Sequence, residues 1–78
     1  MGTRNQNERK FEQWIDEIDG GRTYTRRVQG KHRWFALYHK KVSNTEETLA
    51  FWQEIYDPSG ILREIHEKFP VDKGHRNV

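Results

Sequence analysis

The fold is decided by residues 48–70, TLAFWQEIYDPSGILREIHEKFP, where two β-prone runs flank the tetrad Asp57-Pro58-Ser59-Gly60. Asp in the first position of a turn, Pro in the second and Gly where a left-handed backbone is needed are typical of a three-residue hairpin loop. The stretch therefore predicts antiparallel strands over 48–56 and 61–69. Pro70 ends the second strand, because proline has no amide proton to donate to a neighbour.

The residues before this hairpin predict two more strands and one helix. Residues 22–29 (RTYTRRVQ) and 33–42 (RWFALYHKKV) are rich in β-branched and aromatic residues, and Gly30-Lys31 between them is a plausible turn. An apolar stripe at i, i+3, i+4 and i+7 predicts a helix that begins near Glu8 and ends at Gly20-Gly21; its members are Phe11, Trp14, Ile15 and Ile18. The predicted fold class is α+β, with one N-terminal helix packed on one face of a four-stranded antiparallel β-meander.

The composition indicates a single domain of 78 residues with a thin core. Charged residues make up 33% of the chain and hydrophobic residues 32%, but three Trp, three Tyr and four Phe supply large side chains for burial. We expect an ordered body over about 8–72, with a flexible leader at 1–7 and a flexible polar tail at 71–78.

Several classes of protein are disfavoured by what the chain lacks. It has no cysteine, hence no disulfide and no thiolate metal site, and no apolar run approaches the roughly 20 residues that cross a membrane. A cytoplasmic protein without a cofactor or a membrane partner is the expectation. The net charge of +2 is too small to indicate nucleic acid by itself.

The turn at 57–60 also predicts which residues share a face of the sheet. If Asp57 pairs with Ile61, one face carries the apolar residues that suit the helix, namely Leu49, Phe51, Ile55, Ile61 and Ile65. The other face then presents Trp52, Glu54, Tyr56, Leu62, Glu64 and His66, and a chain of this length has no second helix to cover it. A shift of one residue in register would exchange the two sets.

Strand 33–42 adds to the uncovered face in one of two ways, which the sequence leaves open. One register adds Trp34, Tyr38 and Lys40, and the other adds Phe35, Leu37 and His39. Either register leaves an aromatic patch, and such patches usually mark a partner surface. The predicted binding surface consists of Trp52, Tyr56, Trp34, Tyr38, Arg33 and Lys40, and the predicted function is an interaction module for a homodimer or a protein partner.

Chemistry on this face is the alternative to a purely structural role. Glu54 and Glu64 are predicted to lie opposite each other and to need compensation, either from a basic residue on the neighbouring strand or by a raised pKa on one carboxyl near His66, which would allow proton transfer. If the chain is an enzyme, its candidate catalytic residues are His66, Glu54 and Glu64. His39, His66, His75 and Glu64 have the right chemistry for a metal, but no spacing makes them converge, so we predict no metal site.

RNA is the alternative partner. Basic residues in the first two predicted strands are interleaved with aromatic ones, as expected where rings stack on bases and cations bind phosphates. The aromatic residues concerned are Tyr24, Trp34, Phe35 and Tyr38. The acidic second hairpin would repel a long strand.

Two resemblances bear on these expectations. The segment YDPSGILREIHEKFPVDKGH resembles an uncharacterised family of small prokaryotic proteins with the pattern QEIYD-x-x-G-x-L-x-E-I-H-x-K-x-P-V-D-x-G-H; it covers about half the chain and implies a self-contained domain, without an activity. The order of a helix, a basic meander and a His-bearing end is similar to that of RelE-like ribonuclease toxins. That resemblance implies metal-free RNA cleavage, for which the available residues are Arg33, Lys40, Tyr56, His66 and His75.

Overall fold

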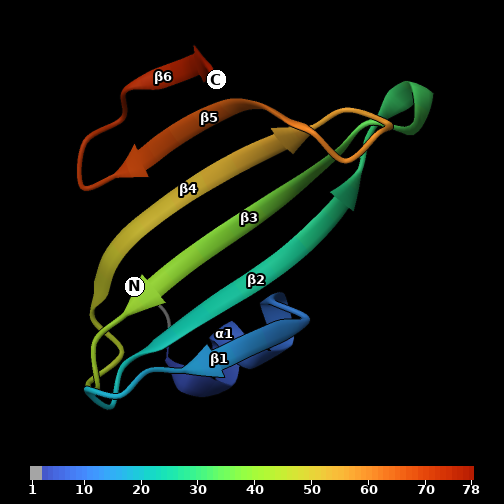
Figure 1. Ribbon diagram of the computed structural model, residues 1–78. Helices are drawn as coiled ribbons and strands as arrows, with labels where there is room; N and C mark the ends of the chain where they lie inside the picture. Colours follow the sequence, from blue (N-terminus) through green and yellow to red (C-terminus); the bar gives the residue numbers. More distant parts are fainter. Residues whose placement is uncertain (1–2) are drawn as a thin grey trace.

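The computed structural model describes residues 3–78 as a single antiparallel sheet with one helix at one end (Figure 1). Its elements are α1 (Arg4–Lys10), β1 (Gln13–Asp16), β2 (Arg22–Gln29), the 3-10 turn η1 (Lys31–Arg33), β3 (Phe35–Val42), β4 (Thr48–Tyr56), β5 (Leu62–Phe69) and β6 (Gly74–Asn77). The strands lie side by side in chain order. The α+β class and the antiparallel meander are confirmed, but the prediction of four strands is wrong, because β1 and β6 extend the sheet at both edges. Over residues 3–78, no helix has the length and apolarity needed to cross a membrane.

Helix α1 begins earlier than predicted because a capping box starts it at Thr3. The Thr3 hydroxyl accepts a hydrogen bond from the Gln6 amide at 3.2 Å, and the Gln6 side chain accepts one from the Thr3 amide at 2.9 Å. This turn occupies most of the segment predicted to be a flexible leader, of which Met1 and Gly2 lie outside the described residues. The T-x-x-Q signal was present in the sequence.

The predicted helix from Glu8 to the glycines is wrong, because its apolar stripe does not share one surface. Phe11 is buried at the end of α1, whereas Trp14 and Ile15 belong to strand β1 and point to opposite faces of the sheet. Ile18 is fully exposed in the turn that follows. A short stripe of four apolar residues fits more than one periodicity, so the helical interpretation was not unique.

Three of the hairpins use the same five-residue turn. The amide of the first residue donates to the carbonyl of the fifth in turns 17–21, 43–47 and 57–61, at 2.8, 2.8 and 3.0 Å. The fourth residue has a positive φ in each turn: Gly20, Glu46 and Gly60. The predicted turn at 57–60 is confirmed, and Glu46 is the exception that takes a conformation normally left to glycine.

The hairpin between β2 and β3 turns at His32 and Arg33, two residues later than the predicted Gly30 and Lys31, and is strained. The Trp34 amide donates to the Lys31 carbonyl at 3.0 Å, and the two residues between them, His32 and Arg33, have φ angles of 56° and 68°. Two consecutive non-glycine residues with positive φ each cost free energy of folding.

Relieving this strain is expected to stabilise the protein. The double substitution His32→Asn and Arg33→Gly should raise the free energy of unfolding by about 1–2 kcal/mol, because Asn and Gly adopt positive φ more readily. Urea unfolding followed by tryptophan fluorescence measures the change. Lys31→Gly is the control: Lys31 has no positive φ, so glycine there should give no gain. A double variant that is no more stable than the wild type would contradict the strain.

The two faces of the sheet follow from the pairing of the strands. The helix-side face carries Tyr24, Arg26, Tyr38, Lys40, Phe51, Gln53, Ile55, His66 and Lys68; the helix-free face carries Thr25, Arg27, Phe35, Leu37, His39, Lys41, Trp52, Glu54, Tyr56, Ile65 and Glu67. Of the two registers left open for β3, the structure has the one that places Phe35, Leu37 and His39 beside Trp52. In Figure 1 the helix lies behind the sheet, so the helix-free face is toward the viewer.

A β-bulge overturns the predicted pairing of β4 with β5. Tyr56 pairs with Leu62 as predicted, but the next pair is Ile55 with Glu64, which leaves Arg63 as the extra residue. The predicted pairs Glu54–Glu64 and Trp52–His66 are therefore wrong, because the residues of β5 change face after this bulge, up to a second register shift opposite Phe51 and Trp52.

The buried core is small and differs from the predicted one. It consists of Phe11, Tyr24 and Val42, with Tyr38 and Phe51 packed against it. Of the predicted core residues, Ile65 lies on the helix-free face, and Ile61 and Leu49 are exposed. The core therefore sits beneath the helix at one end of the sheet and does not extend along the hairpin.

The C-terminal segment is a strand where a flexible tail was predicted. β6 pairs with β5, with His75 opposite His66. The loop before it is held by Asp72, whose carboxylate accepts hydrogen bonds from the Gly74 amide at 2.9 Å and from His66 Nε2 at 2.6 Å.

Candidate functional site

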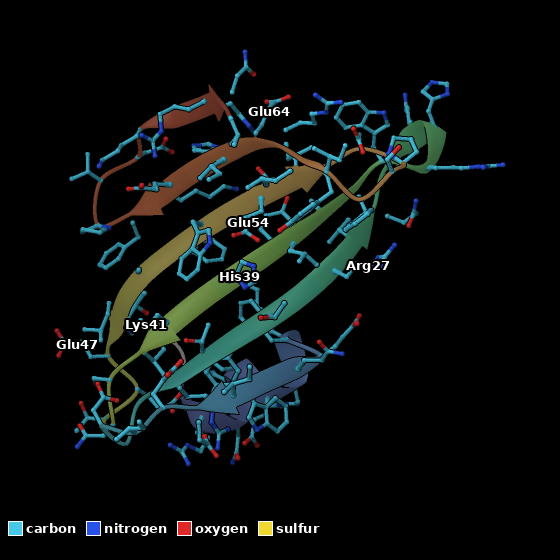
Figure 2. The ribbon with its side chains drawn as sticks, in the orientation of Figure 1. Arg27, His39, Lys41, Glu47, Glu54 and Glu64 are labelled. Atoms are coloured by element: carbon cyan, nitrogen blue, oxygen red, sulfur yellow. The ribbon has the colours of Figure 1, made fainter. Side chains whose placement is uncertain are left out.

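A polar network occupies the middle of the helix-free face (Figure 2). Alternation along β4 puts Trp52, Glu54 and Tyr56 on the same side, and β3 places His39 next to them. The Glu54 carboxylate accepts hydrogen bonds from His39 Nε2 at 2.8 Å, from the Tyr56 hydroxyl at 2.9 Å and from Trp52 Nε1 at 3.2 Å. On its other side, His39 Nδ1 is 3.0 Å from the Thr25 hydroxyl.

The direction of these hydrogen bonds follows from the carboxylate. An ionised Glu54 only accepts, so Nε2 of His39 carries a proton, and in the neutral imidazole Nδ1 accepts from Thr25. Both histidine nitrogens and both carboxylate oxygens have partners inside the protein. The network is therefore complete without a ligand.

Stacked rings frame the network on both sides. Trp52 stacks on His39 with ring centroids 5.0 Å apart, and Tyr56 stacks on Phe35 at 5.1 Å. The guanidinium of Arg27 lies over Phe35 at 4.1 Å. All four rings are only half-buried, so the face combines a satisfied polar centre with accessible aromatic surface.

The electrostatics of the site favour an ionised Glu54. Burial alone would raise the pKa of its carboxyl, but the hydrogen bonds from His39, Tyr56 and Trp52 outweigh burial and lower the pKa below its ordinary value. Burial and the neighbouring carboxylate raise the pKa of Tyr56. Glu54 is thus an ionised acceptor at neutral pH, and its lowered pKa does not support the alternative in which a raised pKa makes it a proton donor.

The other two candidate catalytic residues lie on the opposite face of the sheet from Glu54. His66 bonds Asp72, its ring lies 4.4 Å from that of His75, and His75 Nδ1 is 3.4 Å from Glu64. His66, Glu64 and Glu54 therefore do not form one site. Across residues 3–78, no three His, Asp or Glu side chains are placed to hold a metal ion.

The predicted binding surface is divided by the structure. Trp52 and Tyr56 lie on the helix-free face, Tyr38 and Lys40 on the helix-side face. Arg33 and Trp34 lie at the hairpin tip, at the end of η1. The residues named for the RelE-like resemblance are likewise spread over both faces and the tip, so they do not assemble one cleavage site.

Sequence reasoning missed His39 and Thr25 as partners of Glu54. The histidine expected there was His66, because the pairing across the hairpin was extended through the bulge at Arg63. Whether His39 lies on the same face as Glu54 depends on the register of β3, which the sequence left open. Comparisons of the chain with protein-family models, with curated proteins and with solved structures found no match.

Proposed function

We propose that this protein is an interaction domain whose helix-free face packs against a second copy of the chain. The main support for the proposal is that one face of the sheet is not covered by any described helix. Domains normally bury a sheet between layers, but here α1 lies over β2 on one side, and over residues 3–78 no other helix covers the sheet. The molecule exposes 5565 Å², against roughly 5,000 Å² for a compact chain of its 9.5 kDa.

The polar network suits a face that becomes covered. A buried polar group destabilises an interface when it lacks a partner. Glu54, His39 and Thr25 satisfy one another within the protein, so covering them leaves no unpaired group among the three. The surrounding apolar surface, formed by Phe35, Leu37, Trp52, Tyr56 and Ile65, supplies the area whose burial drives association.

The charges on this face favour a second copy as the occupant. Its cations without an ion pair among the described residues, Arg27 and Lys41, come from β2 and β3, whereas its carboxylates, Glu54 and Glu67, come from β4 and β5, where Arg76 and Lys73 also pair with Glu67. A two-fold axis parallel to the strands would set the β2–β3 side of each copy, with its unpaired cations, against the β4–β5 side of the other, with its carboxylates. Neither Arg27 nor Lys41 is in an ion pair within residues 3–78.

Sedimentation equilibrium between 1 and 100 µM tests the proposal. We expect a dimer for the wild type and a monomer for Ile65→Lys, because the charge would be buried in the interface. Ile55→Lys is the matched control. Both isoleucines are half-buried, and each is paired with a glutamate, Ile65 with Glu54 and Ile55 with Glu64. They differ in that Ile55 lies on the helix-side face. The Ile55→Lys variant should remain a dimer.

Two results would overturn the proposal. One is a wild type that stays monomeric throughout this range. The other is an Ile65→Lys variant that dimerises as well as Ile55→Lys. A measurement on the wild type alone guards against a misfolded variant: acrylamide should quench tryptophan fluorescence less at 100 µM than at 1 µM, because Trp52 becomes covered on association.

A further inference from the structure

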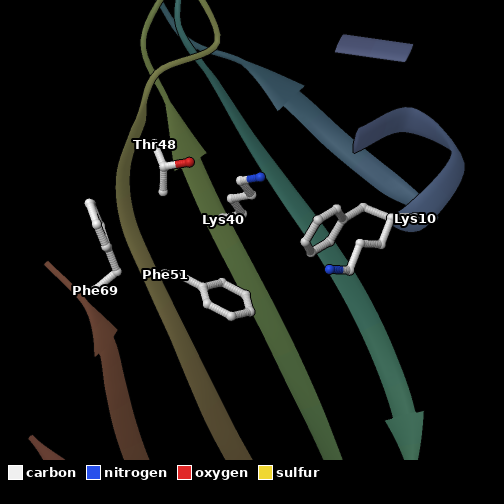
Figure 3. Close-up of a pocket in the computed structure, with 6 residues that line it drawn as sticks. Lys10, Lys40, Thr48, Phe51 and Phe69 are labelled. Carbon is white, nitrogen blue, oxygen red and sulfur yellow. The ribbon is translucent and has the colours of Figure 1, made fainter. Parts of the chain in front are cut away.

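The helix-side face carries a groove beyond the edge of the helix. Two adjoining cavities of about 320 and 290 Å³ share Lys10, Phe11 and Phe51 in their walls. Lys40, Thr48 and Phe69 complete the first cavity, and Arg26, Val28 and Tyr38 complete the second. In Figure 3, Lys10 and Lys40 reach into the same space from α1 and β3, with Phe51 and Phe69 along the strands beside them.

Three cations that line this groove, and a fourth beside it, are in no ion pair of the described residues. Lys10, Arg26, Lys40 and Lys68 are absent from the ion pairs within residues 3–78. Lys40 donates to the Asn7 side chain at 2.9 Å, and Lys68 lies over the rings of Tyr38 and Phe51 at 5.1 and 5.8 Å. These contacts position the ammonium groups without neutralising them.

The nearby carboxylates already have other partners, although Glu46 attracts Lys40 and Asp72 attracts Lys68. Glu46 is paired with Arg4 and also binds Asn7 and Tyr24, and Glu64 faces His75. Burial and repulsion from Lys10 lower the pKa of Lys40, and they outweigh the attraction to Glu46, which raises it. An anion in the groove would relieve that repulsion.

We propose that this groove binds single-stranded nucleic acid. Lys10, Arg26, Lys40 and Lys68 would contact backbone phosphates. The exposed ring of Phe69 would stack on a base, and bases would displace Lys68 from the rings of Tyr38 and Phe51. Cations interleaved with accessible rings along a groove are the combination that single strands require. The adjoining cavities run past more than one ring, which suits successive nucleotides better than a small anion. The site lies on the opposite face of the sheet from the proposed dimer surface, so it does not depend on dimerisation.

Fluorescence anisotropy with labelled 12-nucleotide rU and dT strands tests this binding in 50 mM salt. The triple variant Lys10→Gln, Arg26→Gln and Lys68→Gln should weaken binding at least ten-fold. It should also reduce the slope of log affinity against log salt by about 2, since each phosphate contact of a single strand contributes about 0.7. The control variant Arg9→Gln, Lys31→Gln and Arg33→Gln removes the same charge at positions outside both proposed surfaces, and should keep most of the affinity.

Stacking is tested with two exposed aromatic residues. Phe69→Ala should weaken binding roughly five-fold or more, and Trp34→Ala, which removes a similarly exposed ring at the hairpin tip, should have little effect. Circular dichroism shows whether each variant is folded. The rU and dT strands distinguish a site for RNA from one that accepts either backbone.

Three outcomes would overturn the proposal. The wild type fails to bind either strand at 100 µM protein, the two triple variants lose affinity equally, or inorganic polyphosphate competes as well per phosphate as the oligonucleotides. The last two results would indicate non-specific electrostatic binding of a polyanion rather than a specific nucleic-acid site. None of them bears on the dimer, which sedimentation tests without nucleic acid.

Discussion

Replacing Tyr24 with Ala is expected to unfold the protein at 25 °C. Tyr24 is fully buried and contacts Phe11 and Trp14, with ring centroids 5.6 and 6.0 Å away. Loss of a buried aromatic side chain costs about 3–5 kcal/mol, which is comparable to the whole stability of a domain of this size. Far-UV circular dichroism and amide proton dispersion measure the loss of structure.

The matched variant Tyr24→Phe separates the ring from its hydroxyl. It keeps the packing and removes the 2.9 Å hydrogen bond to Glu46, so it should cost about 1 kcal/mol and remain folded. If the Tyr24→Ala variant unfolded cooperatively with nearly wild-type stability, the claim that the fold depends on this small core would be contradicted.

Replacing Glu46 with Ala is expected to lower the free energy of unfolding by about 2–4 kcal/mol. The carboxylate accepts hydrogen bonds from Asn7 at 3.0 Å, from Tyr24 at 2.9 Å and from Arg4 at 3.2 Å. It thereby ties α1 to the β3–β4 turn, and its loss leaves the buried donors of Asn7 and Tyr24 without an acceptor. Urea unfolding measures the change, and Glu47→Ala, which alters an exposed neighbour, should stay within about 0.5 kcal/mol of the wild type.

The positive φ of Glu46 adds a second test of the same residue. Glycine adopts a φ of 63° without strain and alanine does not, so Glu46→Gly should be more stable than Glu46→Ala by about 1 kcal/mol. Both should remain below the wild type, because both lose the carboxylate. If Glu46→Gly equalled the wild type, the anchoring role would be refuted.

The same carboxylate makes the stability depend on pH. Burial opposes ionisation, but the bonds from Asn7, Tyr24 and Arg4 prevail and lower the pKa of Glu46 in the folded state. A lowered pKa stabilises the fold fully above the ordinary value near 4.3, and this contribution is lost as the pH falls through the folded pKa. The difference in stability between the wild type and Glu46→Gln should therefore shrink between about pH 6 and pH 3.

Local chemistry accounts for the parts of the fold that could be predicted. Strands β2 and β4 begin and end where the sequence places them, and the turn at 57–60 has the predicted hydrogen bond. Each depends on residues that are neighbours in the chain, such as the β-prone run RTYTRRVQ or the order Asp-Pro-Ser-Gly. Alternation along β4 also placed Trp52, Glu54 and Tyr56 together on one face, which is half of the candidate site.

The remaining parts depend on residues that are distant in the chain. β1 forms because Trp14 packs on Tyr24, and no pattern within residues 8–18 distinguishes that strand from a helix. The bulge at Arg63 inserts one residue opposite β4, which moves His66 away from Glu54 although the turn itself was predicted correctly.

By itself, the sequence determined a small antiparallel sheet with a tight hairpin at 57–61 and too few apolar residues to cover both faces. Tertiary structure alone decided which face each side chain occupies, and so brought His39 to Glu54 and grouped Lys10 with Lys40. The physical reason is that the choice of face has a period of two residues, so one bulge or one step in register exchanges every side chain of a strand. Only packing against α1 and the neighbouring strands selects between the two arrangements.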